Sequence, residues 1–303
     1  MAAYSSAAKR GASGPPGAPR RIAYLYAAPA FIAFVAFLLV PILATVGLSF
    51  ARWDGIGPIR WAGLANYVAI FTDPGLREAL LHVLVMVVFY CALPIALGLV
   101  LAAALTRRPV RGLTFFRVVL FLPYVISGVV VAVIWRAVYD PTGGTLNVFL
   151  QAVGLGGLAK PWLGDSTTVL PALGVAGTWV ETGLCLVLFL AGIQNISLDL
   201  YDAARVDGSD PVQEFFAVTL PGVRRELAVA LVITVIAAFR NFDLVYNTTS
   251  GGPGTASVLP TLVVYQRAFL AGQVGSAAAL AITITAIVFV VAAVARRLTE
   301  DAG

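Results

Sequence analysis

The chain has 303 residues, of which 60% are hydrophobic and only 12% are charged. Soluble domains carry roughly a quarter charged residues, so this composition excludes a soluble protein and leaves a lipid bilayer as the solvent for most of the surface. The net charge of +5 implies no nucleic-acid partner, because its excess falls at the ends of apolar segments.

The first 21 residues are rich in Ala, Ser, Gly and Pro, which is typical of a disordered tail. The apolar run that follows is too long for a cleavable signal peptide and lacks a clear cleavage site. We therefore predict a disordered cytoplasmic tail over residues 1–21, a transmembrane domain over residues 22–298, and a second cytoplasmic tail over residues 299–303.

Six apolar segments separate the charged residues of the chain. A membrane-spanning helix needs about 20 mostly apolar residues. The segments have about that length or more, except the fifth, which is short, and the fourth contains one charged residue, Glu181. The predicted fold class is all-α, a polytopic membrane protein. Its six transmembrane helices are expected at 22–50, 79–106, 112–138, 168–192, 222–246 and 274–296.

The basic residues predict the orientation of these helices, because Lys and Arg are concentrated in cytoplasmic segments. With both termini in the cytoplasm, 13 of the 20 basic residues lie inside and 7 outside. The inside set comprises Lys9, Arg10, Arg20, Arg21, Arg107, Arg108, Arg111, Arg117, Arg205, Arg224, Arg225, Arg296 and Arg297.

The longest cytoplasmic segment, residues 195–227, has the residue pattern of two short helices rather than of a loop. Ser197 can cap the first helix. Gly208 suits the left-handed position that ends it. Asp210 can cap the second helix, with Pro211 at its first position and Gln213 completing a capping box. We expect Leu220-Pro221 to end that helix and restart the chain as the fifth span.

This helix pair can serve either of two purposes. It can rest on lipid headgroups as an amphipathic interfacial element, or it can dock a second protein. Ala203 and Ala204 would leave a smooth surface for close approach. The charges favour protein docking, because the cytoplasmic leaflet is anionic and one side of the pair carries Asp199, Asp202, Asp207 and Asp210.

The same segment resembles the EAA loop of binding-protein-dependent ABC importer permeases. The loop pattern appears as Asp202-Ala203-Ala204, then Gly208, then Val218-Thr219-Leu220-Pro221, with Asp in place of the leading Glu. The resemblance implies that the first helix sits in a cleft of a separate ATPase subunit. The residues it implies for this coupling are Tyr201, Asp202, Ala203, Ala204, Asp207, Gly208, Leu220 and Pro221.

Further stretches, at 121–155, 178–196, 249–257 and 265–269, resemble the carbohydrate-uptake branch of that family, of the maltose and glycerol 3-phosphate type. The resemblance implies the first of two non-identical permease subunits in a bacterial inner membrane, carrying a sugar, glycerol 3-phosphate or a glycerophosphodiester. It also implies a second homologous permease, two ATPase subunits that bind ATP and Mg, and an extracytoplasmic solute-binding protein. This chain itself is expected to bind no cofactor.

A few polar residues inside the spans are candidates for lining a solute pathway. Glu181 lies near the middle of the fourth span, where charges are costly and usually functional. The apolar stretch between Glu226 and Arg240 rises only about 20 Å, less than the roughly 30 Å of hydrocarbon. Arg240 is therefore expected within membrane depth or beside a water-filled cavity. The candidates are Trp179, Glu181, Arg240, Asn241, Asp243 and Tyr246.

Each candidate also has a structural interpretation. Glu181 can pair with a neighbouring helix or neutralise Arg240, and Arg240 can extend outward beside Asp243. Trp179 can simply pack, as most membrane Trp residues do. A buried, apolar role is also expected for Cys91 and Cys185, and no metal site is predicted.

Two other classes of membrane protein compete with an importer subunit. A secondary transporter driven by an ion gradient often shows two related halves, and no convincing repeat links residues 22–138 with 168–296. A secondary transporter would also leave the helix pair at 195–221 without an explanation. A membrane-embedded enzyme would need clustered catalytic groups. The chain has no P-loop, so we expect it to hydrolyse no ATP by itself.

Overall fold

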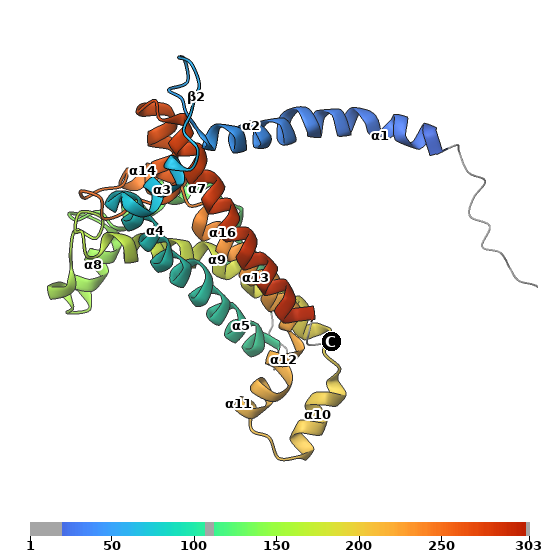
Figure 1. Cartoon of the computed structure of the whole chain (residues 1–303). Coiled ribbons are helices and arrows are strands. Elements are labelled where there is room, and N and C mark those ends of the chain that lie inside the picture. Colours follow the sequence, from blue (N-terminus) through green and yellow to red (C-terminus); the bar gives the residue numbers. More distant parts are fainter. Residues whose placement is uncertain (1–19, 107–111, 301–303) are drawn as a thin grey trace, which may run out of the picture. The chain divides into compact units, whose positions relative to one another are not determined.

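A computed structural model of the chain describes residues 20–106 and 112–300 (Figure 1). Most of the two predicted tails, residues 1–19 and 301–303, and the basic residues Arg107, Arg108 and Arg111 lie outside the described residues. The chain divides into two units, residues 1–47 and residues 48–303.

The first unit is one helix that runs on into the start of the second unit. It comprises α1 (Arg20–Phe34), the π-helical segment η1 (Val35–Leu39) and α2 (Val40–Ser49). Residues Tyr26–Ser49 form a stretch long and apolar enough to cross a membrane. Phe31 and Phe37 are exposed, as expected for a helix that is hydrophobic on every side.

The second unit opens with a short antiparallel ribbon, so the fold is not purely helical. Strand β1 (Ala51–Arg52) pairs with β2 (Arg60–Trp61), with Ala51 opposite Trp61 and Arg52 opposite Arg60. Helix α3 (Ala65–Thr72) follows. Its buried Asn66 donates hydrogen bonds to the carbonyls of Ser49 and Ala51, at 2.9 and 2.8 Å, which ties α3 to the ribbon.

The second predicted span is confirmed and begins five residues earlier than expected, at Pro74 rather than residue 79. Asp73 caps it by accepting a hydrogen bond from the backbone N–H of Gly75, and Pro74 occupies the favoured first helical position. The helix comprises α4 (Pro74–Val87), the π-helical segment η2 (Val88–Ala92) and α5 (Leu93–Thr106).

The third predicted span, 112–138, is not one helix. It consists of α6 (Leu113–Val125) and α7 (Gly128–Val138), bent by 101°. Ile126 and Ser127, between the two helices, both have extended backbone with ψ near 140°. Pro123 contributes to the break, because it lacks the N–H that would bond one turn earlier.

The fourth predicted span is confirmed as α9 (Val169–Gln194), which is central to the bundle of the second unit. It packs against η2, α5, α6 and α13. Gly183 allows α6 to approach closely, because a Cβ at that position would collide with the carbonyl oxygen of Leu120. Before α9 the chain forms α8 (Thr145–Ala152) and the 3-10 turn η3 (Gly156–Leu158).

The fifth predicted span, 222–246, is shorter than expected and broken. Helix α13 (Arg224–Phe239) has 16 residues, about 24 Å at 1.5 Å per residue. After a break at Arg240–Phe242 the chain continues as α14 (Asp243–Thr248). The remaining elements are α15 (Pro260–Tyr265), the π-helical segment η5 (Gln266–Leu270) and α16 (Val274–Glu300), which confirms the sixth predicted span.

The described residues thus contain four helices that are long and apolar enough to cross a membrane, and a fifth if α6 and α7 count as one bent span. The prediction of six uninterrupted spans was wrong at the third and fifth segments. Both interruptions place backbone and polar side chains inside the apolar bundle.

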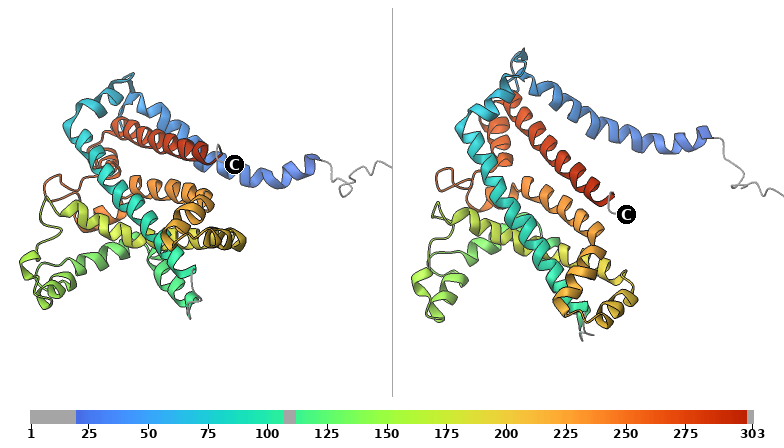
Figure 2. Two further views of the ribbon diagram at one scale, coloured as in Figure 1. Left: turned by 90° about the horizontal axis from the view of Figure 1, so that it is seen from below. Right: turned by 60° about the horizontal axis from the view of Figure 1, so that its bottom comes forward.

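The segment between α9 and α13 forms α10 (Leu198–Val206), α11 (Pro211–Glu214), the π-helical segment η4 (Phe215–Thr219) and α12 (Leu220–Gly222). These elements lie at one end of the second unit, and α3, α7, α8 and α14 lie at the other (Figure 1). The two views of Figure 2 show the same separation. The C-terminal ends of α5 and α16 lie toward the α10–α12 end.

Three of the π-helical segments precede a proline by the same spacing. Segments η1, η2 and η4 each end two residues before a proline, at Pro41, Pro94 and Pro221. Proline clashes with the carbonyl four residues earlier, and in each case that carbonyl lies within the wider π turn. The expectation that Pro221 ends its helix was therefore wrong. The helix continues to Gly222, and the break falls at Val223.

Candidate functional site

The two broken helices meet each other in the second unit. Helices α7 and α14 pack together, each immediately after its own break. At the contact, a Cβ on Gly128 would lie 3.0 Å from the Cβ of Asp243, so the small residue at the start of α7 is required by the close approach of α14. The break at Ile126–Ser127 therefore faces the break at Arg240–Phe242.

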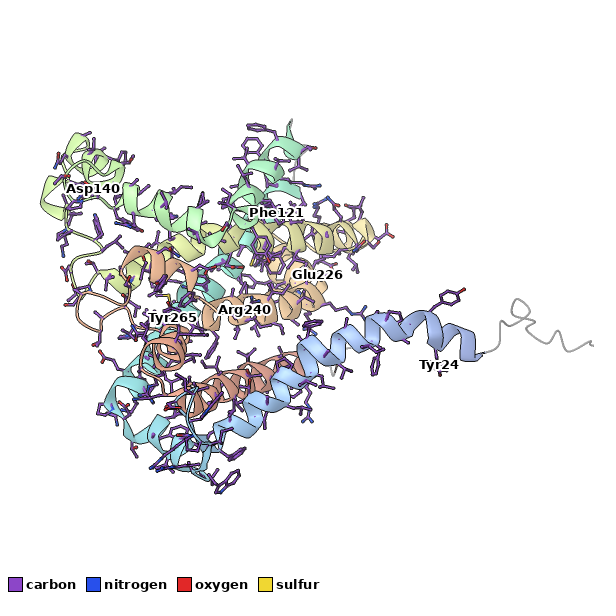
Figure 3. All side chains as sticks on the ribbon, turned by 90° about the horizontal axis from the view of Figure 1, so that it is seen from above. Tyr24, Phe121, Asp140, Glu226, Arg240 and Tyr265 are labelled. Carbon is purple, nitrogen blue, oxygen red and sulfur yellow. The ribbon has the colours of Figure 1, made fainter. Side chains whose placement is uncertain are left out.

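A cavity of about 350 Å³ lies where these breaks meet. Figure 3 marks Arg240 at the end of α13, near the middle of the second unit in this view, whereas Asp140 lies at its edge beyond the end of α7. The cavity combines charged, amide and aromatic groups with aliphatic walls. It is lined by Tyr90, Tyr124, Ile126, Gly128, Val131, Val180, Glu181, Ile233, Ile236, Ala237, Arg240, Asn241, Phe242, Asp243 and Leu244.

Glu181 is the most buried charged residue of this lining, with 4% of its surface exposed. Helix α9 carries it into the bundle. Its Oε2 has no hydrogen-bond partner among the described residues, and no ion pair links it to Arg240 within that part of the chain. Burying a carboxylate oxygen without a hydrogen-bond partner costs free energy. Water or a polar solute in the cavity can supply the missing hydrogen bond.

Arg240 and Asp243 are exposed residues, and both line the cavity at the break between α13 and α14. Arg240 ends α13, with its backbone N–H donating to the carbonyl of Ile236 at 2.9 Å. Asp243 begins α14. A helix C-terminus carries partial negative charge and an N-terminus partial positive charge. The positions of this Arg and this Asp therefore complement the helix ends that they occupy.

Asn241, between these two residues, is a buried structural tie. Its Nδ2 donates a hydrogen bond to the Tyr90 hydroxyl at 2.9 Å, and its carbonyl accepts one from the Thr261 hydroxyl at 3.0 Å. These contacts connect η2, the break and α15. The break is thereby held in one position by residues that are far away in the sequence.

Trp179 and Tyr246 do not line the cavity. Trp179 lies on α9 in edge contact with Trp135, with ring centroids 5.9 Å apart. Tyr246 stacks on Phe242 at 5.0 Å, and Phe242 is the residue that reaches the lining. The geometry therefore unites Glu181, Arg240, Asn241 and Asp243 and leaves the two predicted aromatic residues outside the cavity.

Sequence reasoning missed Tyr90, Tyr124 and Phe242, the aromatic residues that do line the cavity. Tyr90 and Tyr124 stood in runs assigned to continuous spans. One signal pointed to the α6–α7 break: Pro123 followed by Ser127-Gly128 inside an apolar segment, a combination typical of helix interruption.

The segment 197–223, which contains α10, α11, η4 and α12, is the second candidate, and its predicted local structure is confirmed. The Ser197 hydroxyl accepts a hydrogen bond from the backbone N–H of Asp199. Asp210 and Gln213 form a complete capping box at the start of α11. Gly208 has a φ of +83°. Around it, the N–H of Ser209 bonds to the carbonyl of Ala204, and the N–H of Gly208 to that of Arg205, the pattern of a Schellman motif.

The two helices of this segment are joined by side chains as well. Arg205 donates to both oxygens of the buried Glu214 at 3.3 Å, and to Asp202 at 3.2 Å. The hydrogen bonds from Arg205 to Glu214 raise the pKa of that guanidinium. The Tyr201 hydroxyl lies 3.1 Å from that of Thr219. The pair is thus one preformed unit.

The outer face of α10 has no cover within the described part of the chain. No residue of α10 is buried, and Leu198, Leu200 and Val206 are strongly exposed. Asp202, Ala203, Asp207 and Gly208 are also exposed, while Tyr201, Ala204, Leu220 and Pro221 are half-buried. A helix that presents both leucines and carboxylates is suited to a protein partner, because apolar patches rimmed by polar residues mark such contacts.

Comparisons with known proteins agree with this arrangement. A family model described as "Binding-protein-dependent transport system inner membrane component" matches residues 94–301. The probable ABC transporter permease protein YurN of Bacillus subtilis is 38% identical over 262 residues, covering 86% of this chain and 89% of YurN. The diacetylchitobiose uptake system permease protein NgcF of Streptomyces coelicolor is 31% identical over 271 residues, covering 86% of this chain and 77% of NgcF.

Among solved structures, a chain of a bacterial alginate ABC transporter has the same fold. That structure is a complex with an alginate pentasaccharide-bound periplasmic protein. The TM-score is 0.77 at 23% identity, covering 93% of this chain and 96% of that chain. The family match spans more than half of the chain. This protein therefore belongs to the family of binding-protein-dependent transport system inner membrane components, as a multi-pass permease subunit that is not itself catalytic.

Proposed function

We propose that the chain forms half of the translocation pathway of an ATP-driven importer for a sugar or oligosaccharide. The observation that carries this proposal is the polar cavity at the meeting point of two broken helices. Broken helices place backbone dipoles and polar side chains inside an apolar bundle without exposing them to lipid. An open polar cavity of that kind is where a hydroxyl-rich solute can exchange its hydrogen bonds with water for hydrogen bonds with the protein.

The composition of the cavity favours hydroxyl-rich over anionic solutes. Two carboxylates, Glu181 and Asp243, and one guanidinium, Arg240, line it together with Tyr90 and Tyr124. Carboxylates accept hydrogen bonds from hydroxyl groups, and two of them oppose a second negative charge. The diacetylchitobiose uptake permease to which the chain is 31% identical is named for a carbohydrate, which supports the same choice. Glycerol 3-phosphate and glycerophosphodiesters are the second choice, because the guanidinium of Arg240 can bind a phosphate group.

The proposed assembly contains this chain as the first of two homologous permeases, two ATPase subunits that bind ATP and Mg, and an extracytoplasmic solute-binding protein. In it, α10 docks in the ATPase subunit, with Tyr201, Asp202, Ala203, Ala204, Asp207 and Gly208 at or beside the contact. Leu220 and Pro221 connect the docked pair to α13. Support comes from the uncovered face of α10 and from the rigid connections between α10 and α11.

Trp179 and Tyr246 have indirect parts in this proposal. Tyr246 stacks on Phe242, and Trp179 on α9 packs against Trp135 on α7. Both position the cavity walls rather than contact the solute.

The experiment is solute uptake in cells that lack this gene, complemented by the full chain together with its partner subunits. Radiolabelled chito-oligosaccharides, maltose, lactose, glycerol 3-phosphate and a glycerophosphodiester form the panel. We expect uptake of a neutral sugar that requires both ATP and the binding protein. Uptake driven by an ion gradient without ATP would identify a secondary transporter, and ATP hydrolysis by the purified chain alone would also contradict the proposal.

A further inference from the structure

A second polar cavity, of about 680 Å³, lies at the opposite end of the second unit from α10, beside the β1–β2 ribbon. It is lined by residues of the ribbon and its turn, of α3, of η5 and of the start of α16, together with Asp73, which caps α4. Its lining comprises Arg52, Trp53, Asp54, Gly57, Pro58, Arg60, Asn66, Ala69, Asp73, Arg267, Gly272, Gln273, Gly275 and Ser276. The predicted orientation puts this cavity on the extracytoplasmic side.

Two like charges stand directly opposite each other at this cavity. Arg52 and Arg60 are partners in the antiparallel register, so their side chains leave the same face of the ribbon about 5 Å apart at Cβ. Both line the cavity. Neither makes an ion pair within residues 20–106 and 112–300. Like charges in that position destabilise a sheet, unless an anion lies between them.

The acidic residues of the cavity are engaged elsewhere. Asp73 accepts a hydrogen bond from Arg267 at 2.6 Å and caps α4 through Gly75. Arg267 is held in turn by Ser276. The Oδ1 of Asp54 accepts the backbone N–H groups of Ile56 and Gly57, at 3.0 and 2.7 Å. These contacts leave the two ribbon arginines without a carboxylate partner.

The ribbon is also fixed too firmly for the two arginines to separate by moving the backbone. The Asn66 side chain donates hydrogen bonds to the carbonyls of Ser49 and Ala51. At the other side, the N–H of Val274 donates to the carbonyl of Trp53 at 3.0 Å. This contact brings the N-terminal end of α16, which carries partial positive charge, to the same cavity. Isolated two-stranded ribbons are only marginally stable, so these contacts set the spacing of the charges.

We propose that this cavity binds an oxyanion, a phosphate or carboxylate group held between Arg52 and Arg60. Guanidinium forks match the geometry of such groups and bind them in a bidentate manner. The group can arrive as a free anion or as the phosphate of a lipid headgroup. A headgroup source fits the neighbouring Trp61, which is 78% exposed, since Trp is enriched at the membrane–water interface.

The test uses the full chain purified in an uncharged maltoside detergent. Thermal unfolding is followed as sodium phosphate replaces sodium chloride at constant ionic strength. We expect a saturable rise in Tm, with apparent affinity about tenfold weaker in Arg52→Gln and in Arg60→Gln. The matched control is Arg77→Gln, an exposed arginine on α4 outside the cavity, which should bind phosphate like the wild type.

A second arm distinguishes the two sources of the anion. If a headgroup is the natural ligand, phosphatidylglycerol added to the micelles protects the wild type, phosphatidylcholine does not, and phosphate competes. If a free anion is the ligand, phosphate protects equally with and without phosphatidylglycerol. Either pattern supports the site, provided that Arg60→Gln weakens the protection by the same factor of about ten.

Stability without phosphate gives an independent check. Removing one of two opposed like charges relieves repulsion, so Arg60→Gln should be at least as stable as the wild type in phosphate-free buffer. Failure of that variant to fold would contradict the unpaired state of the arginines. The proposal is also overturned if phosphate and phosphatidylglycerol act no better than chloride, or if Arg77→Gln behaves like Arg60→Gln.

Discussion

The segment 197–223 and the cavity at the helix breaks are built in opposite ways. In the segment, the capping contacts join residues a few positions apart, such as Asp210 with Gln213 or Ser209 with Ala204, and the contacts between its helices span at most the 18 positions from Tyr201 to Thr219. In the cavity, the defining contact of Asn241 reaches Tyr90, 151 residues away. The first region is shaped by local sequence and the second by tertiary packing.

This difference has a functional consequence. A locally built and externally uncovered helix pair can move as one unit without loss of its internal structure. A cavity whose walls come from α6, α7, α9, α13 and α14 changes shape when those helices move relative to one another. We infer that substitutions in the segment affect coupling, whereas substitutions around the cavity affect folding, solute passage or both.

The largest expected effect is on the packing that supports the cavity. Gly183→Ala puts a methyl group against the carbonyl of Leu120, and overpacking of this kind costs about 3 kcal/mol. We expect a large loss of folded protein, measured by size-exclusion chromatography and Tm. Gly143→Ala is the matched control, since its Cβ would meet no atom within 4 Å. Equal stability of the two variants would contradict the packing of α6 on α9.

The second effect concerns the charges that line the cavity. Glu181→Gln and Arg240→Gln should each lower uptake by about tenfold, the effect of losing one hydrogen bond to a charged group, while assembly with the ATPase is retained. Arg136→Gln, on α7 and outside the cavity lining, is the control. A purely structural Glu181–Arg240 pair predicts a different result: lost folding in each single variant and partial recovery in the charge-swapped double variant.

The third effect tests the segment. Gly208→Val places a β-branched side chain at a φ of +83°, which costs about 1 to 3 kcal/mol and misaligns α10 with α11. We expect normal membrane insertion but loss of solute-stimulated ATP hydrolysis in the assembled importer. Unchanged transport in this variant would count against a coupling role for α10.

The smallest effect is the loss of one cap. Asp210→Ala removes the hydrogen bonds to the N–H groups of Val212 and Gln213, which costs about 1 kcal/mol. Because the contact is local, coupling should weaken only partly and Tm should change little. Asp210→Asn retains an acceptor and should behave like the wild type. A loss of folded protein as large as that of Gly183→Ala would show that the segment is not locally built.

The same contrast explains what the sequence could predict. Helix caps and left-handed glycines depend on neighbouring residues. The predicted caps at Ser197 and Asp210 and the predicted left-handed Gly208 were confirmed. Glu181 and Arg240 could be selected because charges are rare in apolar segments. That they share one cavity required the two breaks to meet, and no local pattern encodes a contact between α7 and α14.

Two other outcomes did not follow from residue type alone. A proline was expected to end its helix at Pro221, but a π-helical turn accommodates it and the helix continues to Gly222. Trp179 and Tyr246 were chosen for chemical type alone. Their rings contact Trp135 and Phe242 and are not part of the cavity lining, an arrangement that depends on tertiary packing.

The central claim is that the cavity at the helix breaks is an aqueous part of the solute pathway. The most direct test places single cysteines at Glu181 and Arg240 in a chain in which Cys91 and Cys185 are replaced by Ala, and measures labelling by a water-soluble thiol reagent. We predict labelling at both positions in at least one of the inward- and outward-facing states, with protection by the transported sugar. Folded protein that remains unlabelled at both positions in both states would contradict the claim.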